Sequence, residues 1–301
     1  MNTPGSKPPA GYWKLPRPCD SRALYTAAKA AGYNVSHWDS EWEVPGGLPG
    51  CWLYNPGSDL VLDIDVDGDG TPDSIRVPGE DLGPRAKRRY TSLTLSAEKR
   101  TERWYASASY TWAKLHGNYE GLVKSTNGQD DTGTTSDFDF KELSYGADGY
   151  LFNDRRHSIK LFGSYQLSPQ WQVGANLLVQ SGTPISCLGG GNGTFGTEFG
   201  YRGVFHTCNV GEDDIAKLGS SGRTPWTATF NPNVVYSPAA LAGLSVQLSV
   251  INLFNSVKPV QVYEQRYDVN AAGTITDYFN YGKARYNTTP RYARLQVQYD
   301  W

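Results

Sequence analysis

The last ten residues of the chain, Tyr292 to Trp301 (YARLQVQYDW), alternate strictly between apolar and polar side chains. On an extended strand this places Ala293, Leu295, Val297, Tyr299 and Trp301 on one face and Arg294, Gln296, Gln298 and Asp300 on the other. A globular strand with one buried face shows the same period of two. The alternative is a strand with one face in lipid and the other in water, and the rest of the chain favours it.

The same alternation recurs in six segments upstream of this strand. They are Thr91–Glu98, Trp104–Trp112, His157–Leu167, Trp171–Gln180, Trp226–Tyr236 and Leu244–Phe254. Most are close to the roughly 9–11 residues of a membrane-spanning strand. Aromatic residues gather at the ends of the apolar faces, as the interfacial girdles of an outer-membrane barrel require.

The connections between these segments fall into two classes. Short turns are expected at Lys99–Glu102, Ser168–Gln170 and Ser237–Gly243, and long polar loops at Gly117–Asp154, Gly182–Gly222 and Asn255–Pro290. Short and long connections alternate without exception. This alternation predicts an all-β fold, a partial antiparallel transmembrane β-barrel of about seven strands with short periplasmic turns, long extracellular loops and a periplasmic C-terminus. A soluble β-sandwich predicts no such alternation.

Composition excludes several other classes of protein. Of the 301 residues 39% are hydrophobic, the mean hydropathy is −0.52, and no stretch approaches the roughly 20 apolar residues of a spanning helix, so a helical membrane protein is excluded. A net charge of −2 without a long Lys/Arg run argues against a nucleic-acid partner. We expect no enzyme, because the sequence has no Gly-x-Ser-x-Gly elbow, phosphate loop or paired-His motif.

Seven strands are an odd number, whereas single-chain bacterial barrels have an even number of strands. We therefore expect this chain to be the C-terminal part of a larger barrel. Residues 1–88 are predicted to be an extracellular loop region, and residues 89–301 the barrel strands with their loops. The Pro/Gly-rich start, Met1–Ala10, has neither the basic nor the apolar region of a secretory signal, so a signal peptide is expected to be absent.

Several segments carry a resemblance to a known family. They are GQDDTG (Gly128–Gly133), SDFDF (Ser136–Phe140), NDRRHSIKLFGSYQ (Asn153–Gln166), LLVQSGTPISC (Leu177–Cys187), INLFN (Ile251–Asn255) and the terminal YARLQVQYDW. Together they resemble the C-terminal barrel of TonB-dependent outer-membrane receptors, and most closely the Oar-like group, whose N-terminal domain is carboxypeptidase-regulatory-like. The resemblance covers roughly residues 50–301, and NDRRH with its flanking strand is its most specific part.

The resemblance implies a location in the outer membrane and a receptor or transporter for an unidentified substrate. Such receptors have about 22 strands, a plug inside the barrel and an N-terminal segment that engages the TonB complex. The plug is expected to be absent here, so the chain alone should not transport, and any contact with TonB would pass through the missing region. Two alternatives stay open: a non-transporting surface or adhesion protein whose loops bind a partner or polysaccharide, and a soluble secreted β-protein.

The four cysteines suit an oxidising compartment. Cys187 and Cys208 lie 21 positions apart in one predicted external loop, with a glycine-rich run between them, and we expect them to form a disulfide. Cys19 and Cys51 are a second candidate pair. A zinc site is the weaker alternative, because there is no Cys-x-x-Cys and the chain has only four His.

An acidic segment at residues 63–73 is the one stretch with clear ligand chemistry. It places Asp63, Asp65, Asp67, Asp69 and Asp73 around two glycines, and oxygen ligands at every second residue can surround Ca²⁺. The position that a calcium loop reserves for a bidentate Glu is Ser74 or Arg76, depending on the register. An acidic turn joining a small hairpin, Leu60–Ile64 with Ser74–Val77, is the alternative. No other cofactor is expected.

Three more groups of residues are candidates for contacts. Asp130, Asp131, Asp137 and Asp139 lie in a predicted external loop and are candidate ligand contacts, with a solvated acidic loop as the alternative. The Arg155-Arg156-His157 cluster is expected to form salt bridges at the rim of the barrel. Leu295, Val297, Tyr299 and Trp301 are expected to contact outer-membrane lipid and to form the signal that the barrel-assembly machinery reads.

Overall fold

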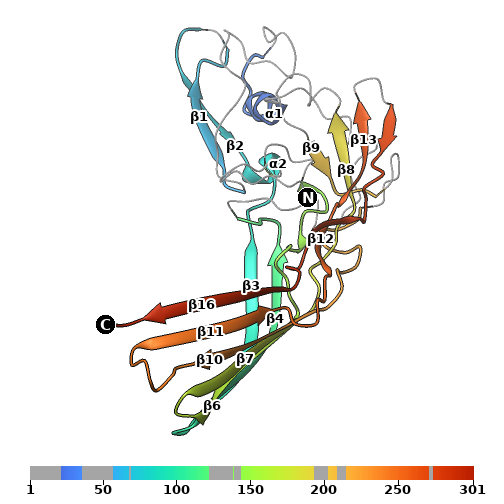
Figure 1. Cartoon of the computed structure of the whole chain (residues 1–301). Helices are drawn as coiled ribbons and strands as arrows, with labels where there is room; N and C mark the ends of the chain where they lie inside the picture. Colours follow the sequence, from blue (N-terminus) through green and yellow to red (C-terminus); the bar gives the residue numbers. More distant parts are fainter. Residues whose placement is uncertain are drawn as a thin grey trace.

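Figure 1 shows the computed structural model of the chain, in which a long curved sheet carries smaller elements at one end. The structure describes residues 22–35, 57–67, 69–121, 138, 144–192, 203–208, 215–270 and 274–301. None of the helices in these ranges is long and apolar enough to cross a membrane. Two helices and several sheets account for the regular structure of these described ranges.

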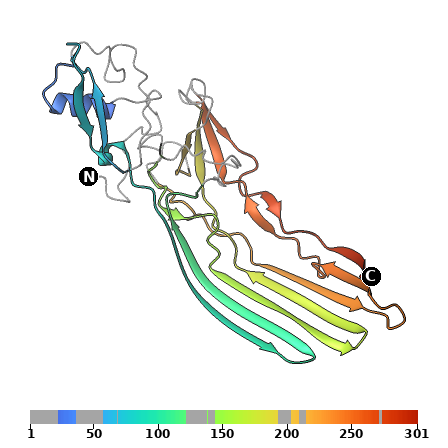
Figure 2. The ribbon, with the colours of Figure 1, turned by 90° about the vertical axis from the view of Figure 1, so that its left-hand side faces the viewer.

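Seven long strands form the main sheet, and the two-residue β5 (Gly149–Tyr150) joins it as an eighth strand beside β4. The long strands are β3 (Arg88–Arg100), β4 (Trp104–Gly117), β6 (His157–Ser168), β7 (Trp171–Gln180), β10 (Thr227–Tyr236), β11 (Leu244–Ile251) and β16 (Tyr292–Tyr299). The order is β16-β11-β10-β7-β6-β4-β3, so that each strand pairs with its sequence neighbour in this set, always antiparallel. Strands β3 and β16 are the two edges and do not pair with each other, so the predicted partial barrel is confirmed as an open, curved sheet (Figure 2).

The register aligns the apolar positions of neighbouring strands. Leu295 lies opposite Leu248, which lies opposite Val234, and Leu161 lies opposite Leu177. Because directly paired residues point to the same side of a sheet, the apolar sets predicted from the sequence share one face, here called the apolar face. The other side, the polar face, carries mainly Ser, Thr, Asn and Gln. A slip of one residue in any strand would turn its apolar set onto the polar face.

Aromatic side chains form a belt at each end of the apolar face. The belt near the short turns contains Trp104, Tyr165, Trp171, Tyr236 and Tyr299, and the belt near the long loops contains Tyr110, Trp112, Trp226 and Phe254. Trp104 and Trp112 are eight residues apart on β4, or about 26 Å along the strand. This spacing is comparable with the roughly 25 Å apolar band of an outer-membrane barrel.

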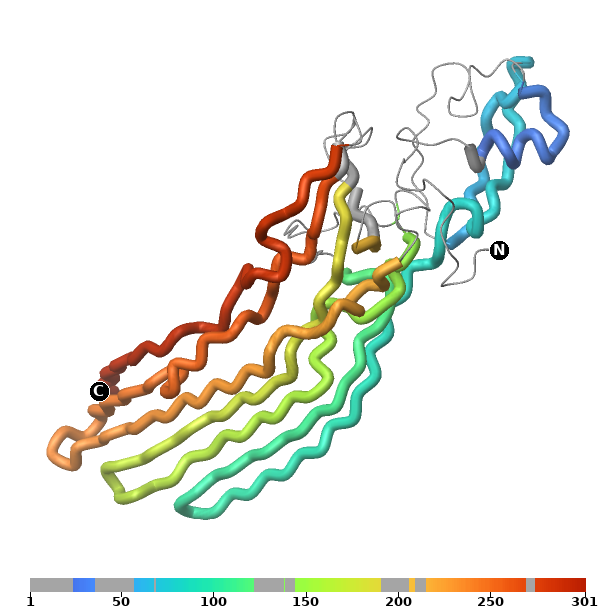
Figure 3. The backbone as a smooth tube through the Cα atoms, turned by 90° about the vertical axis from the view of Figure 1, so that its right-hand side faces the viewer, coloured from blue at the N-terminus to red at the C-terminus, as the bar shows by residue number. Residues whose placement is uncertain are grey.

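The connections follow the predicted alternation. The pairs β3–β4, β6–β7 and β10–β11 are joined by short turns, and the C-terminus lies at that end of the sheet (Figure 3). The longer connections contain strands of their own. They are β5 (Gly149–Tyr150), β8 (Leu188–Asn192), β9 (Gly203–Phe205), β12 (Pro259–Val262), β13 (Gln265–Asn270), β14 (Ile275–Asp277) and β15 (Ala284–Asn287). The long connections are therefore folded elements and not only polar loops.

A small unit with its own core precedes the sheet. It contains α1 (Arg22–Ala30), the hairpin β1 (Leu60–Ile64) with β2 (Asp73–Val77), and α2 (Gly79–Leu82). Leu24 and Ala28 are one turn apart on the alanine-rich α1 and pack against Ile64 and Ile75. The hairpin was predicted from the sequence, with β2 beginning one residue earlier than expected. The two helices were not predicted.

Candidate functional site

The connection after β7 and the connection after β11 fold together at the long-loop end of the sheet. Strand β13 pairs with β8 in parallel, and β9 and β14 flank them in a four-stranded sheet. The Thr183 hydroxyl donates to the carbonyl of Val260 over 3.0 Å. The two connections therefore behave as one body, here called the loop body, which lies over the end of the sheet.

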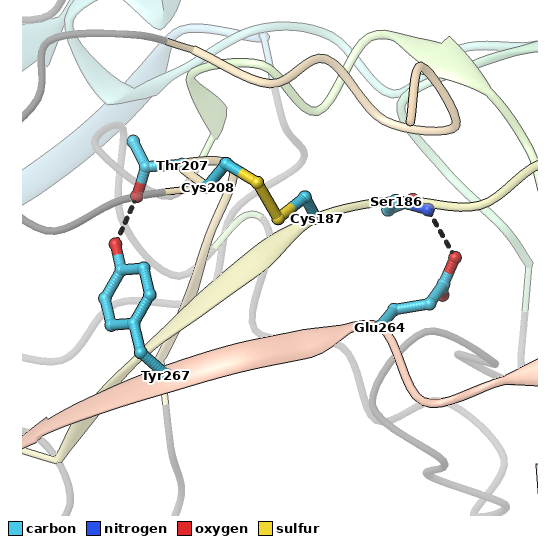
Figure 4. The surroundings of a disulfide bond; sticks show 6 residues. All are labelled: Ser186, Cys187, Thr207, Cys208, Glu264 and Tyr267. Carbon is cyan, nitrogen blue, oxygen red and sulfur yellow. Dashed lines mark hydrogen bonds between the residues drawn. A yellow bond between two sulfur atoms is a disulfide. The ribbon is translucent and has the colours of Figure 1, made fainter. Parts of the chain in front are cut away.

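A disulfide joins two parts of the loop body. Cys187 and Cys208 are bonded, with their Cα atoms 5.0 Å apart, which is the pairing that the sequence favoured. Beside it, the hydroxyls of Thr207 and Tyr267 are hydrogen-bonded at 2.6 Å (Figure 4). Burial raises the pKa of Tyr267 above its ordinary value, so this phenol stays neutral and keeps the hydrogen bond.

A buried carboxyl group lies on the other side of the disulfide. Glu264 is only 4% exposed, and its Oε1 accepts a hydrogen bond of 2.6 Å from the backbone N–H of Ser186 (Figure 4). Its backbone carbonyl also accepts from the N–H of Leu188. Oε2 is buried without a hydrogen-bond partner among the described residues. Burial, reinforced by the charge of Glu120, raises the pKa of Glu264 to about 8, so at neutral pH the side chain is mostly protonated.

A second buried carboxylate organises the rim of the sheet. Asp154 is 1% exposed and accepts a hydrogen bond of 2.6 Å from the backbone N–H of Leu115. It forms salt bridges with Arg156, at 3.1 Å, and with Arg223. Arg155 donates to the carbonyl of Ser181 instead. The expected rim salt bridges are therefore present for Arg156, and the NDRR segment connects the start of β6 to the segment before β10.

The INLFN segment ends β11 with a turn that only a few residue types adopt. Asn252 and Asn255 both have a positive φ, 52° and 51°, a conformation in which Asn is favoured among non-glycine residues. Asn252 is buried, and its amide group bonds the backbone of Ser256 and Thr289. Asn255 accepts from the N–H of Arg291. The two asparagines therefore fix where the loop body leaves β11 and returns to β16.

The polar face contains a shallow hollow of about 340 Å³. Amide side chains line it, with Asn231 donating to Asn176 over 2.7 Å, and the rings of Tyr105 and Phe162, 5.8 Å apart, also belong to the lining. Gly174 makes room there, since a Cβ at this position would lie 2.3 Å from Oδ1 of Asn233. The lining contains no charged side chain.

The acidic segment forms the turn between β1 and β2. Carboxylate oxygens of Asp65, Asp67 and Asp73 lie within 4.8 Å of one another. Asp63 pairs with Ser74 in the hairpin ladder, and Asp69 accepts from the N–H of Thr71. Asp73 accepts from the N–H of Val66, and Asp65 from that of Gly70. Three of the five predicted ligands therefore converge on one point.

The remaining predicted site residues divide into two groups. Leu295, Val297, Tyr299 and Trp301 lie at the β16 edge of the sheet, all more than half exposed. Cys19, Cys51, Asp130, Asp131, Asp137 and Asp139 lie outside the described residues. Glu264 did not emerge from the sequence, because burial in a loop has no periodic pattern. The amide-lined hollow did not emerge either, because it depends on the register that sets Asn176 opposite Asn231. Asp154 was noted only as part of NDRRH.

The structure defines a class of protein: part of the wall of an outer-membrane β-barrel, with an apolar face, two aromatic belts and alternating short and long connections. The sequence is 30% identical over 236 residues to the TonB-dependent transporter Oar of Myxococcus xanthus, a match covering 76% of this chain and 21% of that protein. The chain is homologous to part of a TonB-dependent receptor barrel, and it spans about a fifth of the length of this curated relative. No protein-family model matches the sequence.

Solved structures of the same class are similar at low identity. The siderophore receptor PiuA of Acinetobacter baumannii is 14% identical, and the match covers 71% of this chain and 22% of PiuA with a TM-score of 0.38. The outer-membrane transporter YddB of Escherichia coli is 13% identical, with coverage of 80% and 28% and a TM-score of 0.40.

Proposed function

We propose that this chain forms part of the wall and the external loops of a TonB-dependent receptor in the outer membrane, and that it does not transport by itself. The observation that carries the proposal is the apolar face, which the register makes continuous across all seven strands. Leu95, Leu295 and Val297 on this face are 61%, 67% and 62% exposed. An apolar surface of this extent is typical of contact with lipid and disfavours a soluble β-protein.

The orientation follows from the connections. Barrels of this class place their short turns in the periplasm and their long loops outside the cell. The loop body and the unit of α1, β1, β2 and α2 would then be external, and the C-terminus periplasmic. The loop body would take part in capturing a substrate. Engagement of the TonB complex is assigned to a plug region and not to residues of this chain.

A labelling experiment in cells tests this orientation. Ser220, in the long connection before β10, and Ala240, in the turn after it, are both exposed and are each replaced by cysteine in the full-length receptor. A membrane-impermeant maleimide should label Ser220→Cys on intact cells, and Ala240→Cys only after the outer membrane is permeabilised. The opposite pattern would reject the orientation, and labelling of both variants on intact cells would reject the membrane-spanning sheet.

A non-transporting surface protein is the second candidate. The observation that favours it is the set of exposed aromatic rings beside cations in the loop body, where Arg285 lies over Tyr263 and Tyr286 and Lys283 over Phe279. Such surfaces suit a saccharide or a protein partner as well as a transported substrate. Uptake assays with a full-length receptor separate the two, because only the transporter requires an energised TonB complex.

We also propose that the turn between β1 and β2 binds Ca²⁺ through Asp65, Asp67 and Asp73. The support is the convergence of three carboxylates within 4.8 Å. A hard divalent cation would offset their mutual repulsion and tie the turn to the core of the small unit. The role of the ion would be to order an external segment, not to take part in catalysis.

A further inference from the structure

Three cations converge on one aromatic ring at the rim of the sheet. The Nζ atom of Lys114 lies 5.7 Å from the centroid of the Tyr150 ring, and the Cζ atoms of Arg156 and Arg223 lie 5.0 Å and 5.7 Å from it. This group of Lys114, Tyr150, Arg156 and Arg223 is here called the cation cluster. The negative faces of the ring offset only part of the repulsion between three positive charges.

The cation cluster carries more positive than negative charge. Asp154 is the only carboxylate in the described ranges that forms salt bridges with its members, and it contacts Arg156 and Arg223 but not Lys114. Three positive charges thus meet one negative charge. The Nε–H of Arg156 is buried and meets no acceptor among the described residues. An anion at this place would balance the charge.

The register places Lys114 and Tyr150 on the side of the apolar face, just beyond the aromatic belt near the long loops, and Arg156 and Arg223 reach the ring of Tyr150 from the segments before β6 and β10. Trp112 belongs to that belt, and alternation along β4 brings Lys114 and His116 to the same side as Trp112. Tyr150 pairs with His116, and their rings meet edge to face at 5.5 Å. On β3, Arg89 lies opposite His116 and is an exposed cation, and the carboxylate of Asp148 lies 3.2 Å from the ring of His116.

We propose that the cation cluster binds a phosphate group of an anionic glycolipid in the outer leaflet. This rests on the proposed function, which places the apolar face in lipid and the long loops outside. The headgroup layer then begins immediately beyond the aromatic belt, at the height of Lys114. Arg and Lys together form charge-assisted hydrogen bonds with phosphate oxygens.

The first test compares three probes on the full chain in detergent micelles. Binding of bis-phosphorylated lipid A is measured by native mass spectrometry, beside the same lipid without phosphates and beside inorganic phosphate as competitor. We expect the dephosphorylated lipid to bind at least about tenfold more weakly, and millimolar phosphate not to displace lipid A. Equal binding of both lipids would overturn the proposal. Displacement by phosphate would indicate a free-anion site and also overturn it.

A matched pair of variants locates the effect. Lys114→Gln removes a charge that is not bonded to Asp154, so the rim salt bridges stay in place, and it should weaken lipid A binding about five- to tenfold. Lys160→Gln makes the same chemical change on the polar face of β6 and should leave binding unchanged. An equal loss of lipid A binding in the two variants would overturn the assignment of the phosphate site to the cation cluster.

The lipid-binding test and the test of the proposed function can fail independently. Reversed maleimide labelling of Ser220→Cys and Ala240→Cys would reject the orientation, whatever lipid binds in micelles. Correct labelling together with phosphate-independent lipid binding would reject the cation cluster as a phosphate site and leave the receptor assignment intact.

Discussion

Glu264 and Ser186 are 78 residues apart in the sequence, yet the carboxyl Oε1 of Glu264 accepts a hydrogen bond of 2.6 Å from the Ser186 backbone N–H. This bond joins the two connections of the loop body next to the Cys187–Cys208 disulfide. Burial raises the pKa of Glu264 from 4.5 to about 8, and the charge of Glu120 adds to this effect. The hydrogen bonds from Ser186 and the charge of Arg285 lower the pKa, but by less. Burial outweighs the Ser186 hydrogen bonds, so the protonated side chain is the form that the folded loop body favours.

The sign of this shift predicts that the loop body loosens as pH rises. The contribution of Glu264 to stability is complete below pH 4.5 and is lost progressively as pH rises to about 8. Hydrogen exchange at the amides of Ser186 and Leu188 should report a local opening equilibrium that increases by up to roughly tenfold per pH unit in this window. In Glu264→Gln, which stays neutral and keeps the acceptor, the opening should not depend on pH.

An exposed carboxylate in the same connection provides the control. Asp277 lies in β14 and is exposed, so Asp277→Asn should retain the pH dependence of the wild type. A pH-dependent opening that survives in Glu264→Gln would show that another group controls the loop body.

Reduction of the disulfide should weaken the same region without affecting the main sheet. Cys187 and Cys208 enclose a segment of 21 positions, and the chain-entropy model assigns about 3 kcal/mol to closing a loop of this size. In Cys187→Ser/Cys208→Ser, exchange protection should fall in β8 and β13 and stay unchanged in β10 and β11. A uniform loss of protection across all four strands would show that the loop body and the main sheet unfold together.

The main sheet could be predicted from the sequence because lipid on one side and water on the other give every strand a period of two. The alternation along each strand therefore predicts the apolar face on which Leu248 and Leu295 lie, and the observed register pairs them. The loop body lacks such a pattern. The salt bridge of Asp154 with Arg223 spans 69 residues, and its formation depends on the path of the connections, which local sequence does not encode. Lys114 likewise looks like an ordinary polar strand residue until β5 brings Tyr150 beside it.

Removal of the Asp154 carboxylate charge should destabilise the rim. Asp154→Asn leaves Arg156 and Arg223 without their counter-charge, and we expect the free energy of unfolding to fall by about 2–3 kcal/mol. This is less than the cost of breaking a deeply buried pair, because both guanidinium groups are partly exposed. Denaturant unfolding in micelles measures it. The control is Asp148→Asn, which removes an exposed partner of His116 and should cost less than about 1 kcal/mol. Comparable losses would mean that the salt bridges of Asp154 contribute little.

Calcium should stabilise the small unit that precedes the sheet. Addition of millimolar Ca²⁺ should raise exchange protection at Val66 and Ile75, two core residues close in sequence to Asp65, Asp67 and Asp73. Asp67→Asn should weaken binding about tenfold or more, since it removes one charged ligand of three. Asp81→Asn, in α2 and outside the carboxylate group, is the matched control. If protection does not respond to Ca²⁺ in the wild type, the turn is only an acidic loop.

Deletion of Trp301 tests whether the terminal strand is read during assembly. Trp301 is fully exposed, at 103% relative accessibility, so its removal eliminates almost no packing contacts within this chain. Leu177 on β7 has paired neighbours on both sides and loses contacts when it is shortened to alanine. Packing alone therefore predicts that Leu177→Ala impairs the full-length receptor more than the loss of Trp301. Recognition of the C-terminal strand by the assembly machinery predicts that loss of Trp301 impairs assembly more than Leu177→Ala. We expect this second result, measured as the fraction of receptor folded in the outer membrane. Equal assembly of the two variants would reject a recognition role for Trp301 and leave it as a lipid-facing aromatic residue at the short-turn end of the sheet.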